Sequence, residues 1–93
     1  MSFESIAVRM AAVLLDWVED PVARSAILCR IWSRAVGPAV ARRTEAHGLA
    51  DGVLRVEVLD TAWGKVLEEM APELLAKLNA ALGRPLVRKI EWR

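Results

Sequence analysis

The spacing of apolar residues predicts a helix over roughly residues 3–18. Apolar side chains recur there every three or four positions, as expected for the face of a helix that packs on a core. This first stripe consists of Phe3, Ile6, Met10, Leu14 and Trp17. We therefore expect an N-terminal helix within residues 1–20, with this stripe turned toward the core.

A second apolar stripe follows another face of the same helix. It consists of Val8, Ala11, Ala12, Leu15 and Val18. One helix usually buries one stripe against its own domain, so the second stripe is interpreted as a partner interface. The partner is either a helix of another protein or a second copy of this chain. A helix buried on all sides is the alternative interpretation.

Residues 21–43 are expected to form a second helix followed by a short turn. Asp20 suits the N-cap position and Pro21 suits the first helical position. The predicted core face consists of Leu28, Ile31, Trp32 and Ala35. The pair Gly37-Pro38 ends this helix, because proline cannot continue it. Residues 39–43 follow as one more turn.

The apolar period changes to two near Thr44, which predicts a β-hairpin over residues 44–59. Apolar residues at positions 54, 56 and 58 alternate with charged ones, as in a half-buried strand. The pair Asp51-Gly52 favours a type I′ turn, since both residue types tolerate positive φ. Two antiparallel strands are therefore expected.

The helical period returns over residues 60–82. Pro72 interrupts it, because proline lacks a backbone donor and clashes with the preceding turn. This predicts either a sharp kink or two helices, at 61–70 and 72–82. Residues 85–93 are expected to contain the last strand.

These elements predict one α+β domain over residues 1–93, with a three-stranded sheet and helices packed on one face. The composition is 55% apolar, which excludes intrinsic disorder, and Cys29 is the only cysteine, which excludes a disulfide scaffold. The longest apolar run has six residues, far fewer than the ~20 of a membrane span. We expect a soluble cytoplasmic protein that makes no membrane contact.

Few residues are candidates for catalysis. The chain has one histidine and no tyrosine, and Ser25, Cys29 and Ser33 have no base at a recognisable motif spacing. His47 falls in the first predicted strand, beside a turn, and a metal site needs three or four convergent ligands, so no cluster of metal ligands is expected. The sequence therefore predicts a protein that is not an enzyme and binds no metal or cofactor.

The net charge of +1 conceals a block pattern. Residues 1–20 carry a net charge of −3, residues 21–44 carry +5, residues 45–76 carry −5 and residues 77–93 carry +4. Basic segments of this kind can contact phosphate. The candidate nucleic-acid-binding residues are Arg30, Arg34, Arg42 and Arg43 in one set and Arg84, Arg88 and Lys89 in another. The alternative is that the charged blocks pair with one another.

An ordered series of motifs resembles the DciA family over about residues 22–93. The series is Trp32-x-x-x-Val36-Gly37-Pro38, Ala41-x-x-Thr44, Leu49-x-Asp51-Gly52-x-Leu54-x-Val56-x-Val58, Trp63-x-x-x-Leu67, Leu74-Leu75-x-x-Leu78-Asn79 and Gly83. No single motif in it is diagnostic, because each consists mainly of core and turn residues.

The resemblance implies a fold and a function. DciA-like proteins are bacterial and are linked to loading the replicative helicase at the start of DNA replication. Their folded domain is similar to a type II KH domain, and the family is associated with single-stranded and tailed DNA. The implied protein is a non-enzymatic adaptor that docks on the replicative DNA helicase. The alternatives are a stand-alone single-stranded RNA- or DNA-binding module and a homodimeric interaction domain.

The chain departs from the KH pattern at one position that matters for nucleic-acid binding. KH domains clamp nucleotides with a GXXG loop between two helices. The corresponding joint here is Glu69-Met70-Ala71-Pro72, which contains no glycine. Many relatives also carry a long basic extension that is absent from this sequence. We therefore expect weak, sequence-independent DNA contact.

Overall fold

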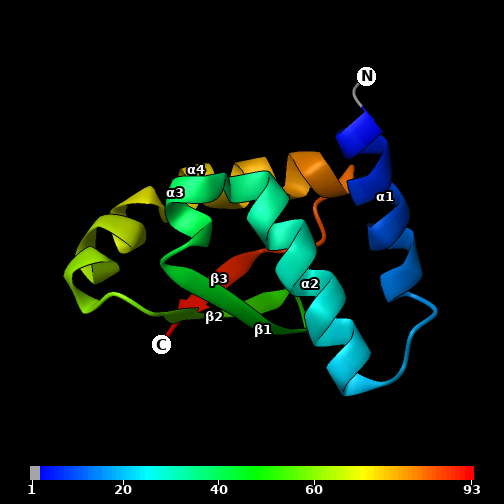
Figure 1. The fold of residues 1–93 in the computed structure, drawn as a ribbon, viewed down its shortest axis with the longest axis horizontal. Helices are drawn as coiled ribbons and strands as arrows, with labels where there is room; N and C mark the ends of the chain where they lie inside the picture. Colours follow the sequence, from blue (N-terminus) through cyan, green and yellow to red (C-terminus); the bar gives the residue numbers. More distant parts are fainter. Residues whose placement is uncertain (1–2) are drawn as a thin grey trace.

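The computed structural model describes the backbone of residues 3–93 and the side chains from Arg9 onward. Four α-helices, one 3₁₀ turn and three strands follow one another in this part of the chain (Figure 1). Their bounds are α1 Phe3–Leu15, α2 Pro21–Val36, α3 Pro38–Ala41, β1 Thr44–Ala50, β2 Val53–Val58, η1 Thr61–Trp63, α4 Gly64–Leu82 and β3 Lys89–Trp92. None of these helices is long and apolar enough to cross a membrane.

The three strands form one sheet with β2 in the middle. The β1 and β2 strands are antiparallel and are joined at Asp51 and Gly52, whose φ angles of 54° and 78° confirm the predicted tight turn. The last strand, β3, lies parallel to β2, with Val53 opposite Lys89 and Val56 opposite Trp92. A parallel neighbour requires a long crossover, which α4 provides.

The helices cover one face of this sheet. Leu54, Val56 and Ile90 are buried on the covered face, whereas Arg55 and Glu57, which alternate with the buried residues of β2, are exposed on the other. Figure 1 shows the helices against the sheet. The core includes these strand residues, the apolar faces of α2 and α4, and two residues of α1. The predicted α+β class, with helices on one face of a three-stranded sheet, is therefore confirmed.

The start of α2 follows the predicted capping pattern. The Asp20 carboxylate accepts a hydrogen bond from the backbone N–H of Val22, and Pro21 occupies the first turn. At the other end, Gly37 has a φ of 89°, a conformation that favours glycine. Pro38 then begins α3, so the chain turns sharply between the two helices.

The structure reverses the predicted faces of α1. Ala12 and Leu15 are buried in the core, and Ala11 and Val18 are half-buried, so the prediction that this stripe is a partner interface is wrong for Ala12 and Leu15. Val8 lies outside the residues whose side chains are described. The physical reason is that α1 packs against α2 and α4, and alanines allow close approach between helices.

The stripe predicted to face the core instead faces solvent. Met10, Leu14 and Trp17 are all exposed, and Trp17 is the most exposed large apolar residue in the described part of the chain. The side chains of Phe3 and Ile6 lie outside that part. The prediction of a core role for the described members of this stripe is therefore wrong.

A single helix, α4, runs through Pro72. The prediction of two separate helices is therefore wrong, and residues 61–63 form a 3₁₀ turn before the helix. Pro72 is exposed, so its ring points away from the core while Leu67 and Leu74 on either side of it are buried. The KH-like order of elements is therefore not confirmed in detail.

The side-chain amide of Asn79 holds the segment between α4 and β3 by bonding to both backbone groups of Val87. Asn79 donates a hydrogen bond from Nδ2 to the carbonyl of Val87 at 2.7 Å and accepts one from its N–H at 3.0 Å. Gly83 ends α4 in the left-handed conformation. The last strand then begins at Lys89, within the predicted range.

Candidate nucleic-acid and partner surfaces

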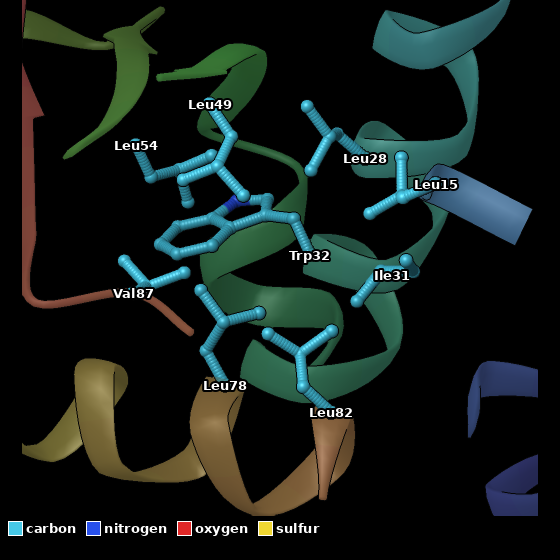
Figure 2. Close-up of a pocket in the computed structure, with 9 residues that line it drawn as sticks. All are labelled: Leu15, Leu28, Ile31, Trp32, Leu49, Leu54, Leu78, Leu82 and Val87. Atoms are coloured by element: carbon cyan, nitrogen blue, oxygen red, sulfur yellow. The ribbon is translucent and has the colours of Figure 1, made fainter. Parts of the chain in front are cut away.

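A small hollow lies at the centre of the core formed by the described residues. Figure 2 shows this hollow, where Trp32 is surrounded by aliphatic side chains that include Leu54 and Leu78. Its volume is about 10 Å³, close to the space for a single water molecule. All nine of its lining side chains are apolar. This hollow is too small for a substrate, and the candidate sites described below lie on the surface.

Part of the first arginine set converges where α2 meets α3. Arg30 and Arg34 are exposed and lie one turn apart on α2, and Arg42 directly follows α3. Arg34 and Arg42 line the same open hollow of about 600 Å³. The sharp turn at Gly37 brings them together, because it folds α3 back from the end of α2. We call Arg30, Arg34 and Arg42 the α2–α3 basic corner.

Arg43 has a different environment from its neighbour Arg42. Its guanidinium lies 4.1 Å from the centroid of the Trp63 ring, a cation–π contact, and its Nη1 donates a hydrogen bond to the carbonyl of Ala39. These contacts connect the start of β1 to η1. Arg43 thus has a structural role that sequence reasoning missed, since nothing in the local pattern links positions 43 and 63.

The second basic set also makes contacts within the domain. Arg84 forms an ion pair with Asp16 at 3.1 Å, and Arg88 donates from Nε to the carbonyl of Asp51 at 2.9 Å. The Arg88 side chain also covers Gly52, where a Cβ would approach it to 2.9 Å. Lys89 is exposed at the start of β3.

The two basic sets lie at opposite ends of the sheet. Lys89 pairs with Val53 at the first residue of β2, whereas the carbonyl of Arg43 accepts a hydrogen bond from Leu59, just beyond the last. The length of β2 separates these ends by roughly 17–20 Å. The sets therefore form two separate surfaces instead of one patch.

The solvent-facing side of the sheet carries a cluster that the sequence analysis did not expect. Nε2 of His47 lies 2.8 Å from Oε1 of Glu57, and Glu45 is the direct cross-strand neighbour of Glu57. The ligand atoms of these three residues all lie within 4.8 Å of one another. The expectation that no metal-ligating residues converge is therefore wrong.

A β-bulge explains this convergence. The register between β1 and β2 shifts between Ala46 and Gly48, so His47 is the extra residue. Ser25 holds the bulge by donating a hydrogen bond to the carbonyl of His47 at 2.6 Å. All three side chains of the cluster are exposed, and Arg55 and Arg93 line the same hollow as His47 and Glu57. These guanidinium groups disfavour an added cation.

An exposed apolar surface covers the outer side of α1. It consists of Met10, Val13, Leu14 and Trp17, together with Val22 at the start of α2. We call these five residues the α1 outer face. Sequence reasoning assigned three of them to the core. The available signal was the competition between two apolar stripes on one helix, which only the packing of α1 resolves.

Comparison with known proteins identifies relatives of this chain. The family model described as Dna[CI] antecedent, DciA, matches residues 7–91. A UPF0232 protein of Mycobacterium tuberculosis is 42% identical over 60 residues, which are 64% of this chain and 32% of the relative. A UPF0232 protein of Rhodococcus jostii is 39% identical over 59 residues, which are 63% of this chain and 31% of the relative. The chain thus spans about a third of the length of these curated relatives.

Proposed function

The chain belongs to the DciA family, and from this membership we propose that it acts in bacterial DNA replication as a non-enzymatic adaptor. In this role it docks on the replicative helicase and assists the loading of the helicase on DNA. The observation that carries the proposal is the family match over residues 7–91, which includes nearly every element of the fold.

The distribution of surface chemistry supports an adaptor. In Figure 1, α1, which carries the α1 outer face, lies at one end of the molecule, and the joint between α2 and α3, which carries the basic corner, lies away from it. Apolar faces of this kind serve protein contacts, whereas arginine groups serve phosphate contacts. Two surfaces of different chemistry allow one small domain to contact a protein and a nucleic acid at the same time.

The DNA contact in this proposal is weak and independent of sequence. Arg34 and Arg42 reach a hollow that is open to solvent and has no deep pocket for a base. Contacts to the phosphate backbone position a protein but do not read bases. Single-stranded or tailed DNA is the proposed ligand, because a helicase is loaded on DNA of this kind.

The direct test is a fluorescence-anisotropy titration of the labelled 93-residue chain with the replicative helicase of the same organism. We expect saturable binding with a Kd of roughly micromolar order. We also expect the chain to increase the amount of helicase retained on a tailed duplex. No binding at roughly tens of micromolar helicase contradicts the proposal.

The alternative function is a stand-alone single-stranded nucleic-acid-binding module. The proximity of Arg34 and Arg42 favours it, because two guanidinium groups on one hollow can contact neighbouring phosphates. The two functions differ in what they require. Tight binding of single strands by the isolated chain, together with no helicase binding, supports the alternative.

A further inference from the structure

The α1 outer face has the pattern of a helix-docking surface. Met10, Val13, Leu14 and Trp17 follow the spacing i, i+3, i+4, i+7, and their exposed fractions are 64%, 58%, 52% and 79%. Met10, Val13 and Leu14 lie on α1, and Trp17 lies in the turn that follows it, where its backbone N–H donates a hydrogen bond to the carbonyl of Leu14. Val22, at the start of α2, is also exposed, at 77%. Several large apolar side chains exposed on one small domain mark an interaction site.

The opposite side of α1 fixes this stripe in place. Ala12 and Leu15 are buried in the core, and Arg24 donates hydrogen bonds from Nη1 to the carbonyls of Leu15 and Val18 at the end of the helix. Asp16 is tied to Arg84 beyond the end of α4. The stripe thus lies on an anchored helix and on the turn that follows it.

The charges around the stripe select the occupant. Glu19 and Asp20 follow the stripe and are both exposed, whereas Asp16, next to Trp17, is paired with Arg84. The cations near this end among the described side chains contact other groups of the domain: Arg24 bonds to backbone carbonyls, Arg84 pairs with Asp16, and the exposed Arg9 lies beside Gly83. Phosphate groups of nucleic acids or anionic lipids are therefore repelled from this end.

We propose that the α1 outer face binds an amphipathic helix of a protein partner, with an apolar stripe flanked by lysine or arginine. The apolar side chains of such a helix pack against the α1 outer face, and its basic residues pair with Glu19 and Asp20. The inference rests on the proposed function, because it assigns this face to the helicase contact. It further requires that the partner helix be cationic.

The first experiment measures helicase binding by chain variants. Val13→Glu and Trp17→Ala are expected to weaken binding at least about tenfold. Glu19→Lys is also expected to weaken binding, and its effect is expected to be larger at low salt than at high salt. The matched control is Val66→Glu, which places the same charge on an exposed valine in the first turn of α4. Since Val66 does not belong to the α1 outer face, this variant is expected to leave binding unchanged. Circular dichroism checks that each variant is folded.

The outcomes separate this inference from the proposed function. If the unaltered chain binds the helicase and Val13→Glu binds equally well, the function stands and the assignment of the α1 outer face is overturned. If the unaltered chain sediments as a dimer and Val13→Glu as a monomer, a second copy covers this face, which also overturns the inference.

A second experiment tests the face without the helicase. The probes are two labelled amphipathic peptides of about 18 residues, with the same leucine stripe flanked by lysine in one and by glutamate in the other. We expect the chain to bind the lysine peptide more tightly, and Val13→Glu to weaken that binding. Equal binding of both peptides, or binding of neither, overturns the inference even if the helicase itself binds.

Discussion

At the scale of single residues, Thr44 connects two parts of the core. Its hydroxyl accepts a hydrogen bond from the indole N–H of Trp32 at 2.8 Å and donates one to the carbonyl of Val40 at 2.8 Å. Thr44 is buried, and no buried side-chain polar atom among the described residues lacks a partner. A buried indole is therefore satisfied by the residue that begins β1.

This geometry predicts a specific cost for removing the hydroxyl. Thr44→Val keeps the shape of the side chain but leaves the buried Trp32 N–H unpaired, whereas the Val40 carbonyl still accepts a hydrogen bond from the N–H of Arg43. We therefore expect a loss of about 1–3 kcal/mol in the free energy of unfolding. Urea denaturation measures this loss. Thr44→Ser keeps the hydroxyl and is expected to cost less. Equal stability of Thr44→Val and the unaltered chain contradicts the proposed role of the bond.

At the scale of elements, the sequence predicted the helix ends and turns that depend on neighbouring residues. The start of α2 at Pro21, the turn at Asp51 and Gly52, and the end of α4 at Gly83 were predictable, since each depends on the conformational preference of neighbouring residues. The buried face of α1 was not. Both of its stripes are apolar, and the choice between them depends on α2 and α4, which are distant in sequence.

Pro72 shows the opposite case, a strong local signal that the tertiary structure overrides. The proline leaves the carbonyl of Glu68 without its usual helical donor, yet buried leucines on both sides keep α4 in one piece. We expect Pro72→Ala to raise the free energy of unfolding by about 1–3 kcal/mol, because the ring is exposed and no packing is lost.

Thermal denaturation of Pro72→Ala, compared with Glu73→Ala, measures this effect. Glu73 is an exposed neighbour on the same helix, paired only with Lys77, so its substitution is expected to change stability by less than about 0.5 kcal/mol. A lower melting temperature for Pro72→Ala would mean that the proline stabilises the native helix.

At the scale of the whole molecule, the pairing of the strands determines where the charged side chains lie. The sequence contained the basic residues, but their positions on opposite ends of the sheet follow from the pairing of Lys89 with Val53. This parallel pairing joins segments separated by the whole of α4, so no local pattern predicts it. The same holds for His47 and Glu57, which meet across a bulge.

The separation of the two basic sets predicts different effects on DNA binding. Alanine at both Arg34 and Arg42 is expected to reduce the slope of log K against log salt for single-stranded DNA by roughly 1.4, about 0.7 for each lost phosphate contact. Alanine at both Arg88 and Lys89 is the matched control and should leave the slope unchanged. Fluorescence anisotropy with labelled oligothymidylate at several salt concentrations measures both; the reverse result would place the phosphate contact at the other end of the sheet.

The unequal exposure of the four indoles gives this chain two built-in optical reporters. Trp32 is sealed in the core against Trp92, whose ring centroid lies 6.2 Å away, whereas Trp17 stands in water. A neutral quencher such as acrylamide therefore reaches Trp17 first and Trp32 last. A partner that covers Trp17 and an unfolding event that exposes Trp32 therefore produce different changes in tryptophan fluorescence, and no attached dye is needed.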